Sequence, residues 1–558
     1  MSINTFLIDD PRLQKSGNNK IIVACKSGPA SSVVQKYIPN SNSVSNTLFN
    51  INIPSENVLV DRHLLIEGTV QLRITVTPSA GAMRLDVVPA PFPFNQLLQS
   101  ASMNINNSKV SVQTEDILNA SLKQFEQKYL SKHCQGSANY VDKYLARFSD
   151  NVDSSNANAF GLASSAEKDS DTIGRGSNNL TMQLLAAGVP GPITSGHNVQ
   201  VAGGANPVEY LCTINFVEPI FGLPTASLQE NDGCYSGLTA IELSFQYTSF
   251  YKRAINYAFA GLGAVVVSAY TTDIIQNSSR AVLRYYSLHP SQYAKLSKKS
   301  VIPFDELVPY KTVEQIGSSI LSNVLSLRQI PDKLYLFIRQ KASDQTANWS
   351  NSTCFPITGV KINFNNVAGL LSEMNQNDLY LMSRRNGSQQ VFNEFKGIID
   401  GVPSIGSYVV IDVTRDLGLD DMLSASSLGQ FSLQVSVTYD RIREKPVVAN
   451  ENVELLILAN YAGILMTESG SSSSMSGLLT KQAVLDCKAK GNSNIDYDDL
   501  TAVSGGNLYK RGMSEVGHLV KAERGRIAQA LDGKVDGSVD AVASKAKNIA
   551  HDRLSKYM

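Results

Sequence analysis

The sequence has no excess of charge of either sign. Its 558 residues include 49 Lys and Arg and 49 Asp and Glu, so the formal net charge at pH 7 is zero. This balance disfavours a strongly basic nucleic-acid-binding protein, because such proteins neutralise phosphates with clustered cations. A chain without net charge has no colloidal repulsion, which favours assembly with copies of itself.

Long apolar runs and a secretory leader are also missing. The first ten residues contain no basic cluster followed by an apolar stretch. The longest nearly apolar run, residues 258–270, has 13 residues, whereas a membrane-spanning helix needs about 20. We therefore expect a chain that is synthesised inside a cell and carries no helical membrane span.

Cysteines are few and isolated. None of the six forms a CxxC pair, and in so long a chain this spacing predicts reduced thiols and no disulfide framework. They are Cys25, Cys134, Cys212, Cys234, Cys354 and Cys487.

Signatures of catalysis are missing as well. The sequence has no GxxxxGK[ST] loop, no GxGxxG after a strand, no HExxH and no GxSxG. His133 and Cys134 are the one close His–Cys pair, without the two further ligands of a zinc site. The aspartates at 496–499 do not fit an EF-hand loop, and the basic pairs at 251–253 and 509–511 carry too few cations for a phosphate groove. We predict no enzyme, no catalytic residue, no cofactor and no metal site.

Strand-forming patterns are abundant. Apolar residues make up 43% and charged residues 18% of the chain, and many short runs alternate at period two, which is typical of half-buried strands. Helical spacing is brief by comparison, as after Glu115. This pattern predicts sandwiches or barrels and not a parallel α/β sheet. The predicted strands are 48–53, a strand pair at 63–77, a hairpin at 100–113, 209–217, 238–247, 264–270, 280–286, 326–339, 360–364, 408–413 and 431–439.

Prolines help to place these strands. Pro303 and Pro309 are expected between strands, where a missing N–H does least harm. Pro331 lies inside the 326–339 run, so we expect the strand there to begin at or after it.

An internal repeat indicates duplication. Met103–Asn107 (MNINN) has a counterpart 259 residues later in Ile362–Asn366 (INFNN). Each is followed by a short apolar stretch and then by helical spacing, at 114–125 and at 373–385. The shared order of elements predicts two related domains.

Two segments differ from the rest. Residues 134–207 lose their periodicity and are expected to form a long exposed loop. Ser469–Gly477 is expected to be a flexible linker. Beyond it, valines and other apolar residues at 535–549 follow an a/d stripe over two heptads. That is too short for an independent coiled coil and favours a helix that docks on a partner.

Three motifs carry a family resemblance. They are Pro91–Asn95 (PFPFN), Ile330–Arg339 (IPDKLYLFIR) and the strand-to-helix segment Thr358–Arg385. Over residues 45–465 the chain resembles the double jelly-roll major capsid proteins of virophages, polinton-like viruses and adintoviruses. These belong to a wider lineage with adenovirus hexon and giant-virus capsid proteins. The recognised resemblance does not extend to the 466–558 tail.

The resemblance implies an all-β fold of two tandem eight-stranded antiparallel jelly rolls, with short helices and a helical C-terminal tail. We expect an N-terminal arm at 1–44 and a first jelly roll at 45–263 that carries the 134–207 loop. The second jelly roll is expected at 264–466, and the Ser-rich linker and amphipathic helical tail at 467–558.

The implied function is that of a major capsid protein. Three copies would form a pseudo-hexagonal, hexon-like capsomer that tiles the icosahedral virion shell of a double-stranded DNA virus. The shell would be assembled inside the host cell. The implied partners are the chain itself, penton and minor capsid proteins, and an inner membrane or the genome through the tail. A Gly-Gly-directed maturation protease, used by some of these viruses, would find candidate sites at Gly505–Gly506 and Gly203–Gly204.

Two other classes stay open from the residues alone. One is a multi-domain β-sandwich protein that binds a receptor or carbohydrate, with an aromatic-lined groove and a monomeric or small oligomeric state. The other is a polysaccharide-degrading enzyme, whose paired carboxylates would come together only in the fold. Because one fold hosts many functions, oligomeric state and not fold separates these classes.

Overall fold

The computed structural model of the chain divides it into two compact units, residues 1–491 and 492–558. The residues that it describes all belong to the first unit. They are 32–55, 58–78, 83–90, 92–126, 130, 180–186, 189–194, 198–201, 207–225, 234–260, 262–287, 299–342, 353–365, 367–399, 402–403, 405–418, 428–441, 451–468 and 470–476. Outside them lie most of the N-terminal arm, His133–Cys134, the aspartates at 496–499, Gly203–Gly204, Gly505–Gly506 and the predicted helical tail.

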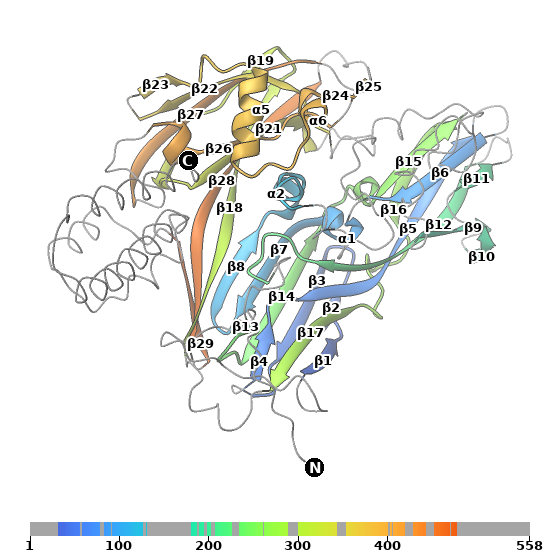
Figure 1. The fold of residues 1–558 in the computed structure, drawn as a ribbon. Coiled ribbons are helices and arrows are strands. Elements are labelled where there is room, and N and C mark those ends of the chain that lie inside the picture. Colours follow the sequence, from blue (N-terminus) through green and yellow to red (C-terminus); the bar gives the residue numbers. More distant parts are fainter. Residues whose placement is uncertain are drawn as a thin grey trace, which may run out of the picture. The chain divides into compact units, whose positions relative to one another are not determined.

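The first group of strands forms two facing antiparallel sheets (Figure 1). If the strands of a jelly roll are lettered B to I along the chain, one sheet has the order B-I-D-G and the other C-H-E-F. The strands B to I are β1 (Ser32–Tyr37), β3 (Asn46–Asn52), β5 (Leu65–Pro78), β7 (Leu98–Ile105), β8 (Ser108–Val112), β12 (Val208–Pro219), β14 (Ala240–Tyr247) and β17 (Arg280–Ser287).

Shorter strands extend these two sheets or form a small third one. They are β2 (Ser41–Asn42), β4 (Val58–Asp61), β9 (Leu180–Ala186), β10 (Val189–Thr194), β13 (Cys234–Tyr235) and β16 (Leu262–Ala269), with β6 (Met83–Pro89), β11 (Asn198–Val201) and β15 (Ile255–Ala260) in the third sheet.

The second group repeats the same two orders. Its strands B to I are β18 (Lys299–Gln315), β19 and β20 (Ser319–Leu321 and Leu325–Gln329), β21 (Lys333–Gln340), β22 (Ile357–Phe364), β23 (Val367–Leu370), β26 (Val409–Asp412), β27 (Leu428–Tyr439) and β28 (Asn452–Glu468). The strands β24 (Ile398–Ile399) and β25 (Val402–Pro403) form a small hairpin, and β29 (Ser471–Ser476) pairs with β28. The fold is therefore all-β with two tandem eight-stranded jelly rolls, as predicted.

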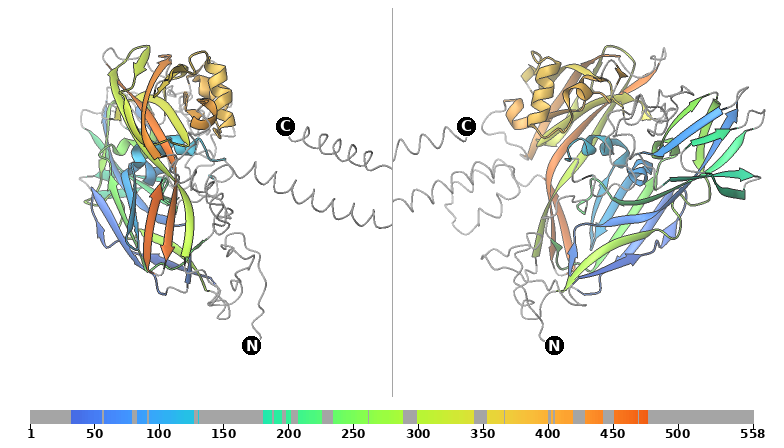
Figure 2. Two further views of the ribbon diagram at one scale, coloured as in Figure 1. Left: turned by 90° about the vertical axis from the view of Figure 1, so that its left-hand side faces the viewer. Right: turned by 45° about the vertical axis from the view of Figure 1, so that its right-hand side comes forward.

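The helices are short and connect strands. They are α1 (Pro93–Leu97), α2 (Thr114–Leu122), the 3-10 helix η2 (Tyr251–Ala254), α5 (Gln376–Arg385), α6 (Phe392–Lys396) and α7 (Val413–Asp416). Helices α2 and α5 occupy the same place in the two rolls, between strands F and G. Figure 2 shows α5 and α6 side by side on the second roll. In the described part of the chain, no helix has the length and apolar character needed to span a membrane.

The Asn-containing hairpins confirm the internal repeat. Asn106 and Asn365 follow strands E of the two rolls, and both have a φ of 51°. The Asn106 N–H donates to the carbonyl of Ala240, whose N–H donates to Asn106 Oδ1. The same reciprocal pair joins Asn365 to Ser432. Each turn is thus tied to strand H by a residue that tolerates positive φ and supplies an acceptor.

Several strand boundaries differ from the predictions. The expected strand pair at 63–77 is the single strand β5, and three strands (β9 to β11) lie in the expected 134–207 loop. Residues 264–287, expected in the second roll, pair with strands of the first. The register shifts on either side of Gly263, so this glycine marks a bulge within β16 and not a domain end.

The proline and serine predictions had mixed outcomes. Pro331 lies between β20 and β21, as expected. The expectation for Pro303 and Pro309 was wrong, because both lie inside β18. Among the described strands β18 pairs only with β28, so its outward side can lack N–H groups. The expected flexible linker at Ser469–Gly477 is wrong for Ser471–Ser476, because β29 continues the sheet as a hairpin on β28.

The PFPFN motif anchors the first core. Phe94 stacks on Phe216 with ring centroids 4.7 Å apart. The buried Glu218 carboxylate accepts the Phe94 N–H at 3.1 Å, and the Asn95 N–H and Nδ2 at 3.0 and 2.8 Å. Burial raises the pKa of Glu218 to about 7, although the hydrogen bonds from Asn95 and Phe94 act in the opposite direction.

The first prediction concerns the Asn365 turn. Asn365→Ala removes the acceptor for Ser432 and puts a residue at positive φ that tolerates it less well than Asn, whereas Asn365→Gly removes the acceptor but adopts positive φ freely. We expect the alanine variant to lose about 1–2 kcal/mol more unfolding free energy than the glycine variant. Denaturant titration of both variants measures the difference, and equal losses would contradict the role of φ.

The second prediction concerns the pH dependence due to Glu218. Its folded pKa of about 7 exceeds the ordinary 4.5, so the folded chain binds more protons than the unfolded chain between these values. The Glu218 contribution to stability must therefore fall as pH rises from 4.5 to about 7, by about 3 kcal/mol.

The test is Glu218→Gln, which cannot ionise. The unfolding free energy of wild type relative to this variant should decline between pH 5 and pH 8. Glu242→Gln, on the exposed side of β14, is the control for removal of one surface carboxylate. Parallel pH profiles for wild type and Glu218→Gln would refute the assignment.

Candidate assembly site at the junction of the two jelly rolls

Strand β21 of the second roll is buried on both faces. One set of alternate side chains packs in the core of its own roll: Leu334, Leu336 and Ile338. The other set is also buried, and two of its members pack with the first roll's core cluster: Tyr335 and Phe337. Leu456 and Leu458 of β28 extend this second set. The outer face of the second roll's B-I-D-G sheet is therefore covered by the first roll.

A buried ion-pair network lies on that covered face. Arg339 Nε contacts Glu454 Oε1 at 2.6 Å, and Nη2 contacts Asp116 Oδ1 at 2.9 Å. Lys311 Nζ contacts the same Asp116 oxygen at 2.8 Å. Arg339 Nη1 also donates to the Glu115 carbonyl oxygen at 3.0 Å. The first turn of α2 thus supplies acceptors from the first roll, and the second roll supplies Glu454 and both of these cations.

Arg339 keeps its charge because neighbouring carboxylates compensate it. Burial alone would lower the pKa of Arg339, but the carboxylates of Glu454 and Asp116 hold that pKa above its ordinary value. The Arg339 side chain is only 1% exposed. A buried charge is tolerated when it is paired and hydrogen-bonded, and removal of one partner leaves the other uncompensated.

A second buried ion pair lies beyond the end of α2. Lys123 Nζ contacts Glu394 Oε1 of α6 at 2.6 Å, with both side chains less than a tenth exposed. The neighbouring Gln124 accepts the Tyr335 hydroxyl at 2.9 Å. Both ends of α2 are therefore fixed to the second roll by polar contacts.

Strand β29 joins the two rolls a third time. The Ser472 N–H donates to Asn107 Oδ1 at 2.8 Å, and Asn106 Nδ2 donates to the Ser471 carbonyl at 3.2 Å. Ser472 Oγ also donates to the carbonyl of Ile105. The Asn106–Asn107 turn of the first roll is thus held by the strand that follows the second. Figure 1 shows β18 and β28 of the second roll passing beside β8 of the first.

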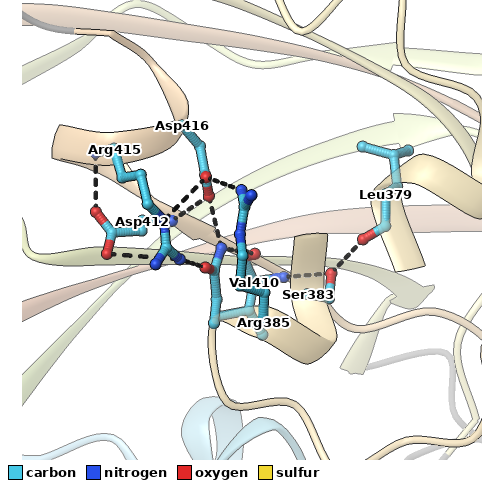
Figure 3. A network of polar contacts seen from close by, with 8 residues as sticks. Leu379, Ser383, Arg385, Val410, Asp412, Arg415 and Asp416 are labelled. Carbon is cyan, nitrogen blue, oxygen red and sulfur yellow. Dashed lines mark hydrogen bonds and ion pairs between the residues drawn. The ribbon is translucent and has the colours of Figure 1, made fainter. Parts of the chain in front are cut away.

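Helix α5 is held to its own roll by a polar cluster (Figure 3). Asp416 accepts from Arg385 Nη2 and Asn386 Nδ2 at 2.6 Å each, and from the Asp412 N–H at 2.9 Å. The Ser383 hydroxyl donates to the Leu379 carbonyl and accepts the N–H of Val410 in β26. Arg415 contacts the Asn386 carboxamide.

The outer side of α5 is open to solvent. Leu381 is 57% exposed, and the Arg385 side chain keeps 57% of its area exposed. The polar cluster therefore fixes the position of α5 on its own roll, while the side chains on the outer side of the helix stay exposed.

Few residues of this junction could be found from the sequence. The basic pair at 251–253 gave no sign of a role here, but Arg253 is 5% exposed and contacts Glu115 Oε1 at 2.7 Å. The one available signal for Arg339 was a charged residue directly after the apolar run 334–338. Nothing local indicated Asp116, which lies 223 residues away from Arg339.

The described ranges bear on the disulfide and metal-site predictions made from the sequence. There, Cys212, Cys234 and Cys354 are buried and not joined in a disulfide. No group of three or more His, Cys, Asp or Glu side chains in those ranges could hold a metal ion.

Two family models match the chain. The model of the Sputnik virophage major capsid protein first domain matches residues 2–285, which are 284 of the 558 positions. The model of the major capsid protein V20 C-terminal domain matches residues 309–463. A curated relative, the putative capsid protein V20 of Sputnik virophage, is 25% identical over 582 aligned positions. This alignment covers 96% of the chain and 90% of the relative.

Solved structures show the same fold. A chain of the Sputnik virophage structure determined by cryo-EM aligns with a TM-score of 0.64 and 20% identity, covering 90% of this chain and 98% of that one. The crystal structure of the mavirus major capsid protein aligns with a TM-score of 0.62 and 15% identity, covering 85% and 95% of the two chains.

The third prediction tests the junction. Arg339→Met leaves Glu454 buried without its cation and weakens the pairing of Asp116, so we expect a loss of about 3–5 kcal/mol of unfolding free energy. The control is Arg73→Met, which breaks a half-exposed pair with Glu209 and should cost less than about 1 kcal/mol. Urea titration followed by circular dichroism measures both, and similar losses would show that the buried network contributes little.

Proposed function

The chain belongs to the family of Sputnik-type virophage major capsid proteins, and from that membership we propose that it forms a homotrimeric, pseudo-hexagonal capsomer. As a major capsid protein it is a component of the virion. In our proposal three chains contribute six jelly rolls, and the capsomers tile an icosahedral shell around double-stranded DNA. The shell is assembled inside the infected host cell.

One observation carries this proposal. The two jelly rolls have the same strand orders, yet each has its own core, and the buried junction between them fixes one roll against the other. Three such rigid pairs placed in a ring give a tile with nearly sixfold symmetry. Copies that build closed rings use a heterologous interface, in which different patches meet.

The role is structural. A capsid protein of this family needs no reaction centre, and we propose no enzymatic activity. The chain itself is the first partner, and penton proteins, minor capsid proteins and contacts of the C-terminal tail with an inner membrane or the genome are further proposed partners. We also propose maturation cleavage at Gly505–Gly506. Both residues lie outside the described part of the chain.

We also propose revised domain limits. The first jelly roll runs to Ser287, because β16 and β17 complete its B-I-D-G sheet. The second begins at Lys299, where β18 starts, and includes β29 up to Ser476. An N-terminal arm at 1–31 and a tail from 477 onward complete the division.

The fourth prediction is the mass of the purified protein in solution. We expect light scattering to give three times the chain mass, and electron microscopy of the same sample to show a pseudo-hexagonal outline. Interfaces of this obligate class bury more than about 2,000 Å² in total, so the denaturation midpoint should rise with protein concentration. A monomer that persists at high concentration would overturn the proposal and favour a β-sandwich binding protein.

A further inference from the structure

The contact between α2 and the outer sheet face of the second roll has an equivalent helix and an equivalent sheet face that do not contact each other within the described part of one chain. We propose that the first turn of α5 in one copy docks on the outer face of β1, β5 and β17 in a second copy. The contact repeats the one that α2 makes with the second roll within a single chain. This inference rests on the proposed function, because it identifies the interface between neighbouring copies in the capsomer.

The residues of the second roll that contact α2 show what such a docking surface contains. Glu454 of strand I lies opposite Arg339 of strand D. Two residues later on strand I, Leu456 lies opposite Lys311 of strand B. We call Lys311, Arg339 and Glu454 the second-roll triad. Lys311 and Arg339 contact Asp116 directly, and Glu454 pairs with Arg339.

The first roll presents the same arrangement at the same register. Arg280 of strand I lies opposite Glu67 of strand D. Two residues later on strand I, Val282 lies opposite Lys36 of strand B. Lys36, Glu67 and Arg280, here called the first-roll triad, thus occupy the positions of Lys311, Arg339 and Glu454.

Both triads contain two cations and one carboxylate, although the Arg and the Glu have exchanged strands. In the second-roll triad Arg339 and Glu454 are buried and Lys311 keeps 40% of its side chain exposed, whereas Glu67 and Arg280 at the positions of Arg339 and Glu454 are only half-buried. Lys36 pairs with Glu67 at 2.6 Å and keeps 53% of its side chain in solvent. Around it, Val34 is 48% exposed, and Leu65 and Val282 are half-buried. These apolar side chains correspond to the surface that Phe337 and Leu456 bury in the second roll.

The helices that face these surfaces are equivalent as well. Asp116 is the third residue of α2, and Asp378 is the third residue of α5. The residues that follow them, Ile117 and Leu379, are both fully buried in their own rolls. Asp378 therefore takes the place in α5 that Asp116 takes in α2.

Asp116 is buried against cations of the second roll, whereas Asp378 contacts no cation of the other roll in the described part of the chain. Asp116 is 3% exposed and contacts two cations of the second roll. Asp378 is half-buried and accepts the Asn375 N–H at 3.2 Å within its own capping box. With Leu381 exposed one turn later, α5 offers one carboxylate and one apolar side chain to a positively charged, partly apolar surface. The complementary charge and the repeated register identify that surface as the first roll of a second copy.

The fifth prediction uses charge reversal. Asp378→Lys should raise the concentration at which the trimer dissociates by about tenfold or more, because it meets Lys36 and Arg280 of the neighbour. Lys36→Glu together with Arg280→Glu should have a similar effect. The variant that combines all three substitutions should regain the trimer. Mass is measured by light scattering over a dilution series, and circular dichroism checks that each variant is folded.

The rescue separates the interface from folding, since Asp378→Lys and the combined variant lose the same capping carboxylate. Glu242→Lys, an exposed reversal on the opposite sheet of the first roll, is the control and should leave the trimer unchanged. A trimer that Asp378→Lys leaves intact, or a combined variant that stays dissociated, overturns this inference alone. A wild-type chain that is monomeric overturns the proposed function instead.

Discussion

The junction depends on the pairing of Arg339 with carboxylates from both jelly rolls. The guanidinium reaches Glu454 in its own sheet and Asp116 at the start of α2. A buried guanidinium is tolerable only with such partners, so the second roll's outer sheet face is suited to contact with the first roll and not to water. The network thus converts two sandwiches, each with its own core, into one body with a fixed relative orientation.

The remaining contacts make sense around that constraint. Lys123 and Glu394 fix the far end of α2, while β29 ties the last strand of the second roll to the Asn106–Asn107 turn. These contacts come from segments far apart in the sequence, so neither roll can shift without breaking several of them. Such rigidity is what a shell subunit needs, because errors in the angle between rolls would accumulate around a closed surface.

Much of the fold could be predicted from local patterns. Period-two runs placed most of the strands, and the repeated Asn turn indicated duplication because positive φ favours asparagine. What failed depended on partners distant in the chain. Ser471–Ser476 forms a strand because β28 is beside it, and Gly263 marks a bulge that looks like a boundary in sequence. The ion pairs of Arg339 could not be predicted, since no local spacing connects residues 223 positions apart.

The prolines of β18 affect how its open edge can pair with strands of other molecules. Pro303 and Pro309 are six residues apart and therefore face the same way, away from β28. Without those two N–H groups the open side of β18 is a poor template for a strand from another molecule. This edge of the sheet is thus protected from amyloid-like stacking with a strand of another copy.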